Sequence, residues 1–366
     1  MRLRKDKWDN ETLQNIFKLK SGNALPNHKI IEGEFPVYGG NGIVGNHKEF
    51  MVQKPTIVIG RVGEYCGSIH LSKKRSWITD NGLYPIEYFK DVDIYFLKES
   101  LMHANLNQYA RKTGQPSISQ SSICAVKIPL PPLEEQKQIA SLFQVIETAI
   151  EQVEGQEKNL KKLQKSLVEG LMSPKPLFGN LLNNKNCTST TFGDIADCDK
   201  KYPEHANEIS RFVGLEYLEA ENFQLQGWGE IANGTTFSKR FVTGDVLFGK
   251  RRAYLKKVAI ADFDGICSGD ILVIRAKAKK MLQGLLPYYI SSDAFIQHAV
   301  STSAGSLSPR TKWKDLSELA VSIPDLKIQE KILEVLQQLD TTVNLLKKQK
   351  ITLKNLKQKL LNEILG

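Results

Sequence analysis

Apolar side chains recur at every seventh position between residues 133 and 173, and the same pattern returns 193 residues later. A second apolar set lies at the neighbouring positions, and the first stretch contains no proline. Heptad spacing of this kind predicts a long helix that lies along a partner helix. The predicted seam consists of Ile139, Ile146, Val153, Leu160 and Leu167 in the first copy and of Ile332, Leu339, Leu346, Leu353 and Leu360 in the second.

Polar residues repeat together with the apolar ones, which marks the two stretches as copies. Gln136 near the start of the first stretch recurs as Gln329. Gln156, which interrupts the apolar seam, recurs as Gln349. A polar residue inside a seam can fix the register of two paired helices. It can equally line a solvated gap, and both interpretations stay open.

Each predicted helix has about 40 residues and is therefore roughly 60 Å long. A stripe of that length needs a partner, and the nearest one is the other copy in the same chain. Both copies are acidic near their start and basic near their end. Antiparallel pairing would bring acidic halves to basic halves, although the same distribution also suits the dipole of each single helix.

The segments outside the two helices read as mostly β structure, with many glycines between short apolar runs. The sequence therefore predicts an α+β fold in which two mostly β domains alternate with two long helices that pair as an antiparallel coiled coil. The expected divisions are 1–132 and 191–323 for the domains, 133–173 and 324–366 for the helices, and 174–190 for a flexible linker.

Several smaller elements are expected inside the domains. Thr56–Ile59 is the clearest strand, and residues 66–71 should form another. Residues 94–109 and 287–300 are the helix candidates. Residues 8–20 read as a turn or a short helix that leads into the first domain.

Charge and cysteine content narrow the class of protein. The formal charge is +10, but the two predicted helices carry only +1 together, −2 in 133–173 and +3 in 324–366. The positive excess therefore lies in the domains, which favours a polyanionic partner, nucleic acid first. Five scattered cysteines without a Cys-x-x-Cys pair suit reduced thiols in a cytoplasm. We find no apolar run typical of a secretion signal or a membrane span.

Motifs for catalysis are missing from the chain. We find neither a phosphate-binding Gly-x-x-x-x-Gly-Lys-Ser/Thr loop nor a Gly-x-Gly-x-x-Gly turn after a strand. The Asn/Asp-Pro-Pro-Tyr/Phe stretch of amino-methyltransferases is also absent. Cys66 and His70 are the nearest pair of metal-ligating types, and we read them as structural because a zinc site needs four ligands. Glu135 and Lys137 have a spacing known from nucleases, but we interpret them as an ordinary helix start.

Basic loops are the better candidates for function. Residues 250–257 hold five cations and a tyrosine after a predicted strand, a density that suits phosphate contacts, and arginine can also read guanine. A solvated hairpin is the alternative. The polar loops 113–119 and 303–310 either hold phosphates or merely connect elements. The basic turn 73–75 has the same two interpretations.

The segments around these loops also carry a resemblance. Residues 128–140 (Ile-Pro-Leu-Pro-Pro-Leu-Glu-Glu-Gln-Lys-Gln-Ile-Ala), with a weaker copy at Pro324, resemble the helix start in specificity subunits of type I restriction–modification systems. Residues 36–42 and 60–63 are similar to one type of recognition domain in that family. Residues 244–252 together with 265–270 are similar to another type. The resemblance covers nearly the whole chain.

The resemblance implies a division of labour. Two target-recognition domains would each read one half of a split DNA target, and the paired helices would set the spacer between the halves. The helices would also dock two modification subunits, which bind S-adenosylmethionine and methylate adenine, and through them restriction subunits that use ATP and Mg. This chain would carry no catalysis and no cofactor. The second helix start lacks the Pro-Pro and Glu-Glu-Gln of the first, so its elbow is expected at a different angle.

With this resemblance, the sequence assigns double-stranded DNA as the ligand of the basic loops. Two other classes stay open: a coiled-coil scaffold with ligand-binding end domains, and a nuclease or methyltransferase with cryptic motifs. The residues predicted to contact DNA are Asn41, Lys48, Arg61, Lys73, Lys74, Arg75, Arg111, Lys112, Lys250, Arg251, Arg252, Tyr254, Lys256, Lys257, Arg310 and Lys312.

Overall fold

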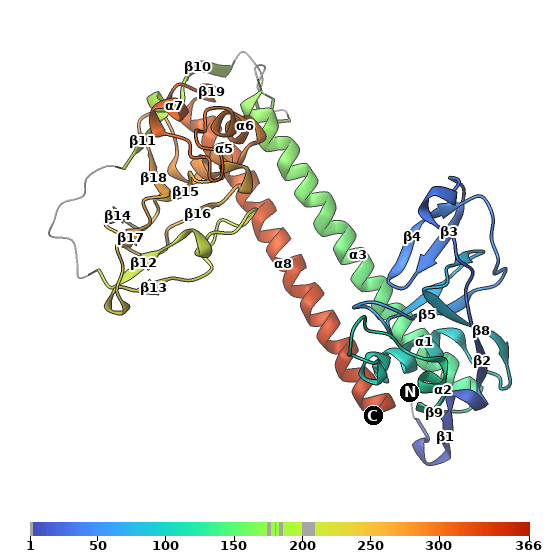
Figure 1. The fold of residues 1–366 in the computed structure, drawn as a ribbon. Coiled ribbons are helices and arrows are strands. Elements are labelled where there is room, and N and C mark those ends of the chain that lie inside the picture. Colours follow the sequence, from blue (N-terminus) through green and yellow to red (C-terminus); the bar gives the residue numbers. More distant parts are fainter. Residues whose placement is uncertain (1–2, 174–176, 180, 183–185, 200–208) are drawn as a thin grey trace. The chain divides into compact units, whose positions relative to one another are not determined.

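The computed structural model describes residues 3–173, 177–179, 181–182, 186–199 and 209–366, which form two compact units (Figure 1). The first unit consists of Met1–Glu154 and Lys348–Gly366, and the second consists of Gly155–Lys347. Two helices of 40 residues, α3 (Leu133–Met172) and α8 (Leu326–Leu365), each contribute one half to each unit. The long helices predicted from the heptads are thereby confirmed.

The first unit contains a four-stranded sheet in the order β2-β8-β5-β6 and a three-stranded sheet in the order β4-β3-β7. All pairings are antiparallel except that of β3 with β7. A separate pair, β1 with β9, closes the unit where α3 begins. The strands are β1 (Asp9–Thr12), β2 (Phe17–Ser21), β3 (Phe35–Gly39), β4 (Gly42–His47), β5 (Thr56–Gly60), β6 (Ile69–Ser72), β7 (Trp77–Ile78), β8 (Gly82–Tyr88) and β9 (Lys127–Leu130), and the short helices are α1 (Ile94–His103) and α2 (Gln120–Cys124).

One hydrophobic core joins the sheet of the first unit to both long helices. Phe17 and Ile59 of the sheet are fully buried, as is Phe96 of α1. They share a cluster with Ile139 near the start of α3 and with Ile364 near the end of α8. Within this unit the two helices therefore run antiparallel.

The second unit repeats the strand order of the first. One four-stranded sheet has the order β11-β18-β15-β16. The other sheet, β13-β12-β17-β14, contains one parallel pair, β12 with β17, and has one strand more than the β4-β3-β7 sheet of the first unit. Strands β10 and β19 pair next to α8 as β1 and β9 do next to α3. The strands are β10 (Cys187–Thr191), β11 (Ala196–Cys198), β12 (Arg211–Val213), β13 (Gly229–Glu230), β14 (Lys239–Phe241), β15 (Val246–Gly249), β16 (Val258–Ile260), β17 (Gly265–Cys267), β18 (Ile271–Ala276) and β19 (Ala320–Pro324), and the short helices are α4 (Phe192–Ile195), α5 (Leu286–Ser291), α6 (Asp293–Ser301) and α7 (Trp313–Ser317).

The core of the second unit is also shared with both long helices. Phe248 of β15 and Phe295 of α6 form a cluster with Leu336 near the start of α8 and with Leu171 near the end of α3. The expected linker, 174–190, falls partly outside the described residues, namely at 174–176, 180 and 183–185. Its described members Phe178 and Leu182 are buried in this same core.

A glutamine joins each domain to the helix that follows it. The side-chain amide of Gln136 donates to the carbonyl of Pro131 (2.9 Å), and its oxygen accepts from the backbone N–H of Asp93 (2.9 Å). Gln329 repeats both bonds in the second unit, to Pro324 (2.9 Å) and from Leu282 (2.9 Å). Both glutamines are buried, so the polar repeat in the sequence reflects a structural joint at the helix start.

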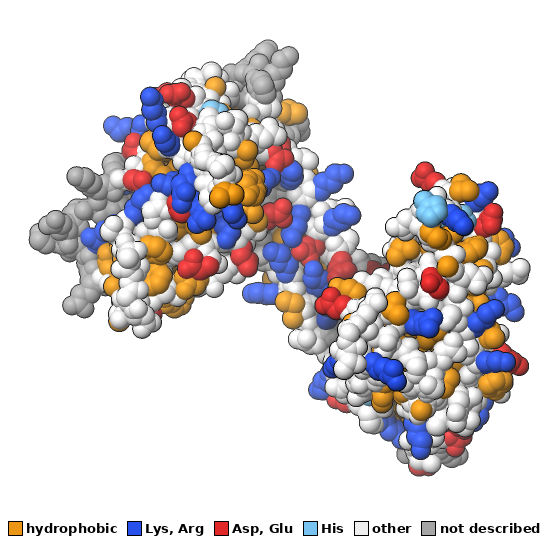
Figure 2. All heavy atoms as spheres, viewed as in Figure 1, with side chains coloured by type: hydrophobic (Ala, Val, Ile, Leu, Met, Phe, Trp, Pro, Cys, Tyr) orange, Lys and Arg blue, Asp and Glu red, His pale blue; other side chains and the backbone are white. Residues whose placement is uncertain are grey.

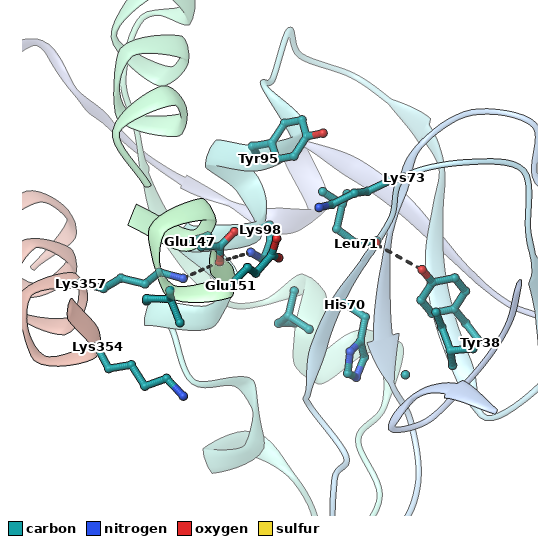
Figure 3. Close-up of a pocket in the computed structure, with 14 residues that line it drawn as sticks. Tyr38, His70, Leu71, Lys73, Tyr95, Lys98, Glu147, Glu151, Lys354 and Lys357 are labelled. Carbon is teal, nitrogen blue, oxygen red and sulfur yellow. Dashed lines mark hydrogen bonds and ion pairs between the residues drawn. The ribbon is translucent and has the colours of Figure 1, made fainter. Parts of the chain in front are cut away.

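A charged cluster fastens α8 to the first unit. Glu147 of α3 accepts hydrogen bonds from Lys357 (2.6 Å) and from Lys98 of α1 (Figure 3). Lys357 also pairs with buried Glu99 (3.0 Å). Burial raises the pKa of Glu147, but the two lysine hydrogen bonds outweigh it and bring that pKa to about 2. The carboxylate therefore stays ionised well below neutral pH.

The second unit has different chemistry at the matching positions. Asp340 lies 193 residues after Glu147. It accepts hydrogen bonds from Gln164 of α3 (2.6 Å) and from the hydroxyl of Tyr288. Burial, with Asp340 beside it, raises the pKa of Tyr288 above its usual range. Two uncharged side chains, Gln164 and Tyr288, thus bind Asp340, whereas two lysines bind Glu147 in the first unit.

The predicted seam positions differ in burial. Ile139, Ile146, Val153 and Ile332 are buried, whereas the side chains of Leu160, Leu167, Leu339, Leu346, Leu353 and Leu360 are half-buried. Gln156 and Gln349 are both exposed. The two polar interruptions therefore face solvent.

The smaller elements differ from expectation in three places. Residues 8–20 form β1 and β2 with a short turn between them, because their partners β9 and β8 lie far along the chain. The helix expected over 94–109 ends at His103, two residues before Asn105 with its left-handed φ of 46°. The helix expected over 287–300 is interrupted at Ser292, whose hydroxyl caps α6.

Candidate nucleic-acid interface

Three segments of the second unit meet where β15 ends. The backbone N–H of Lys250 donates to the carbonyl of Asp270 (2.9 Å), and the N–H of Thr311 donates to that of Lys250 (3.2 Å). The N–H of Arg252 donates to Pro309 (2.8 Å). The basic loop 250–257 and the polar loop 303–310, which the sequence proposes separately, are therefore parts of one surface, the second corner.

Cations outnumber carboxylates at the second corner. Asp270 accepts two hydrogen bonds from Arg310 (2.6 and 3.1 Å) and lies 3.7 Å from Arg251. The Arg310 hydrogen bonds hold the pKa of Asp270 below its usual range. Arg251 also donates to the hydroxyl of Ser308 (3.1 Å), and Arg252 is exposed. One carboxylate orients two guanidinium groups without neutralising the corner.

The first unit has a corner with the same backbone hydrogen bonds. The N–H of Arg61 donates to the carbonyl of Asn81 (2.9 Å), and the N–H of Ile118 donates to that of Arg61 (2.9 Å). The N–H of Gly63 donates to Pro116 (2.8 Å). Each bond has its counterpart in the second unit, 189 residues later in the strand loop and 193 later in the polar loop. The basic loop is thus a copy of the 61–68 loop, and we name this surface the first corner.

The two corners differ in the residues that occupy their left-handed backbone positions. In the first corner these are Gly63 (φ 87°) and Gly67 (φ 82°). In the second they are Arg252 (φ 53°) and Lys256 (φ 50°). A side chain in this conformation costs about 1–2 kcal/mol, so the second corner keeps two cations where the first keeps two glycines.

Twelve of the predicted DNA-contacting residues lie at the two corners. In the first, Ser117 bridges to both Val62 and Arg111, and Gly40 of the β3–β4 turn lies against Val62 and Asn81. The corner residues are Asn41, Arg61, Arg111 and Lys112 in the first unit and Lys250, Arg251, Arg252, Tyr254, Lys256, Lys257, Arg310 and Lys312 in the second.

Four predicted residues lie away from the first corner. Lys73, Lys74 and Arg75 follow Ser72, which pairs with Thr56 at the opposite end of β5 from Gly60. Arg75 stacks 4.9 Å from the Phe50 ring centre, and Lys74 donates to the carbonyl of Glu34 (3.2 Å). Lys48 lies at the far end of the β3–β4 hairpin from its turn.

Two further cations in the second corner bind groups of their own unit. Lys256 pairs with Asp293, which also pairs with Lys165 of α3 (2.8 Å). These lysine hydrogen bonds hold the pKa of Asp293 below its usual range. Lys257 donates to the carbonyl of Leu215 (2.7 Å). These two side chains anchor the basic loop.

A tyrosine projects from each corner. Tyr254, which was predicted, is 53% exposed, and Tyr65, which was not, is 54% exposed. Each is the fifth residue after the glycine that ends β5 or β15. That shared spacing was visible in the sequence once the two loops were aligned on their glycines.

The first unit also has a hollow of about 650 Å³ between β6, α1, α3 and α8 (Figure 3). Lys98 and Lys357 in its wall are paired with Glu147, and Lys354 pairs with Glu154 (2.9 Å). Burial lowers the pKa of His70, which faces the same hollow. The charges of the hollow are thus mostly paired within the unit.

The surface of the second unit agrees with a basic corner. On the face seen in Figure 2, Lys and Arg side chains gather over the region of β15, β16 and β18.

Among the described residues no group of three His, Cys, Asp or Glu side chains could hold a metal ion. Within the same part of the chain, no helix is long and apolar enough to cross a membrane. All five cysteines are free thiols.

Comparison with known proteins gives matches over both units. A family model described as "Type I restriction modification DNA specificity domain" matches residues 5–162 and 184–355. The type I restriction enzyme EcoprrI specificity subunit of Escherichia coli is 31% identical over 143 residues, which span 38% of this chain and 35% of that protein. The type I restriction enzyme MjaVIII specificity subunit of Methanocaldococcus jannaschii is 23% identical over an alignment of 402 residues, covering 98% of this chain and 92% of that protein.

A solved structure has the same fold over the whole chain. The crystal structure of the type I restriction–modification system S subunit from M. genitalium matches with a TM-score of 0.68 and covers 100% of this chain and 98% of that chain. The sequences are 17% identical. At this identity the likeness concerns the arrangement of strands and helices.

Proposed function

Because the chain belongs to the family of type I restriction modification DNA specificity domains, we propose that each of its two units reads one half of a split DNA target. The observation that carries the proposal is the pair of corners. They share a backbone framework and differ in six of eight loop side-chain types, from Arg61 to Ser68 and from Lys250 to Lys257. Equal frameworks with unequal side chains suit two domains that bind the same kind of ligand and read different sequences.

Charge supports DNA as that ligand. The second corner presents Arg251, Arg252 and Arg310 around the single carboxylate of Asp270. Arginine binds phosphate and can bond to two acceptors of guanine in the major groove. The first corner is less basic, with Arg61 and Arg111 beside Asn41, and amide side chains suit adenine.

The two long helices would set the spacer between the half-sites and dock the modification subunits. Their continuity over 40 residues and their attachment at buried glutamines support a rigid connection. Exposed apolar residues on both helices, Val145, Leu163, Leu345 and Ile351, support docking of partner subunits.

Catalysis belongs to the partners in this proposal. S-adenosylmethionine would bind to two modification subunits, and ATP and Mg would bind to restriction subunits. The chain itself would contribute recognition alone, in the cytoplasm, where free thiols persist.

The test is to purify the chain with the methyltransferase subunit encoded beside it and to measure duplex binding with and without the chain. We expect DNA binding that requires the chain and weakens steeply as salt is raised, because phosphate contacts release counterions. A complex that binds no DNA at low salt would instead favour a scaffold with ligand-binding end domains. Methylation by the isolated chain would favour a cryptic methyltransferase.

A further inference from the structure

The two corner loops share only two of eight side-chain types. Counted from Gly60 or Gly249, the first residue is a cation, Arg61 or Lys250, and the fifth is a tyrosine. The other six positions exchange small, acidic or apolar residues for arginine, lysine, alanine or leucine. Two otherwise divergent loops have thus kept a cation and a phenol at the same distance from the strand.

The fold does not account for the tyrosines. Tyr65 is 54% exposed and Tyr254 is 53% exposed, although a buried ring would contribute far more to stability. Neither hydroxyl has a hydrogen-bond partner in the part of the chain that the structure describes. Each ring therefore presents an unused donor to solvent, four residues after a cation, at the same loop position in both units.

We propose that Tyr65 and Tyr254 each donate a hydrogen bond from the phenol hydroxyl to a phosphate oxygen of duplex DNA, beside the cation that begins the loop. This inference rests on the proposed function. Two half-sites of different sequence have only the sugar–phosphate backbone in common, so residues common to both corners suit backbone contacts. The positions that differ, such as Val62 against Arg251 and Gly63 against Arg252, then read the bases.

The experiment uses the complex with its methyltransferase subunits and the variants Tyr65→Phe and Tyr254→Phe, which keep the ring and remove the donor. Affinity is measured for a duplex with the target and for an unrelated duplex. Each variant should lower both affinities by the same factor, about tenfold, because a hydrogen bond to a charged group is lost. The ratio of the two affinities should not change.

Tyr88→Phe is the matched control, because Tyr88 is 41% exposed at the end of β8 far from Gly82 and from the corner. It should leave both affinities unchanged. A loss confined to the target duplex would overturn the inference, since the tyrosines would then read bases. The inference would also be overturned if the two tyrosine variants kept their affinities for both duplexes, or if they failed to assemble the complex while DNA binding itself was unaffected. Equal affinity of the wild-type complex for both duplexes would contradict the proposed function. The comparison of the tyrosine variants with wild type is independent of that outcome, because it depends only on the affinity for DNA.

Discussion

Arg252 adopts a left-handed backbone conformation at the position where the first corner has Gly63. Among the residues that the structure describes, its guanidinium makes one long hydrogen bond, to the carbonyl of Leu307 (3.3 Å), and is otherwise exposed. Local contacts therefore do not repay the backbone strain of about 1–2 kcal/mol. A strained backbone at an exposed cation indicates that the Arg252 side chain serves to bind a ligand.

Arg252→Gly should separate stability from binding. Glycine removes the strain but enlarges the freedom of the unfolded chain, so the free energy of unfolding should change by less than about 1 kcal/mol. Affinity of the complex for its target should fall about tenfold, because one cationic contact is lost. Urea unfolding and duplex titration measure the two effects. Full affinity in the variant would place Arg252 outside the interface.

Arg251→Ala tests the more enclosed arginine of the same corner. Removing its guanidinium should weaken target binding by about tenfold, because a contact to a base is lost. Lys279→Ala is the control, because exposed Lys279 follows β18 at the end opposite to Ile271 and the corner. Equal binding by the two variants would remove the 250–257 loop from the interface.

At the level of elements, the two helices fasten their domains through matching positions with different chemistry. Glu147 with Lys357 in the first unit corresponds to Asp340 with Gln164 in the second, at the same offset of 193. In the first attachment both partners are charged, whereas in the second only Asp340 is charged. The two units should therefore respond differently to acid.

Glu147→Gln should destabilise the first unit at neutral pH by about 2 kcal/mol, because two half-buried lysines lose a carboxylate. The folded pKa of Glu147 is about 2, below the ordinary value of 4.5. Its contribution is therefore complete above about pH 5 and is lost as the pH falls from 4.5 toward 2. Urea unfolding of wild type and variant across this range measures the difference, with exposed Glu151→Gln as control. A difference that does not shrink on acidification would contradict the ionic attachment.

Heptad periodicity predicts long helices well because the information is local and repeated five times. The start of α3 at Leu133 agrees with the predicted division at 133. Strands β1 and β2 were missed because their formation depends on β9 and β8, which are distant in the chain. Phe178 and Leu182 lie in an Asn-rich stretch whose composition hides their place in the core.

For the whole molecule, the sequence predicted the alternation of domains and helices, and its resemblance assigned the two domains to different types. The structure shows the same order in the sheets β2-β8-β5-β6 and β11-β18-β15-β16, and the other sheet of the second unit adds one strand, β14. Short, divergent strands and a change of offset from 189 to 193 conceal this duplication in the sequence. The hidden duplication also explains which candidate site residues the sequence predicted. Charge density alone pointed to Lys73–Arg75, which lie away from the corner, and overlooked Tyr65.

Shortening both helices tests the spacer role. Deleting 152–158 together with 346–352 removes one heptad from each helix and keeps the seam in phase. Each helix loses about 10 Å, which corresponds to about three base pairs of DNA. The preferred distance between half-sites, measured with duplexes of graded spacer length, should shorten accordingly. An unchanged preference in a folded variant would contradict the ruler.

The most direct test of the central claim is to map methyladenine across a genome in cells with and without this chain, with the methyltransferase partner present. We predict methylation at one motif made of two short defined blocks separated by an undefined spacer of constant length. That methylation should disappear when the chain is removed. A single continuous motif, or a methylation pattern that does not depend on the chain, would contradict recognition of a split target by two units.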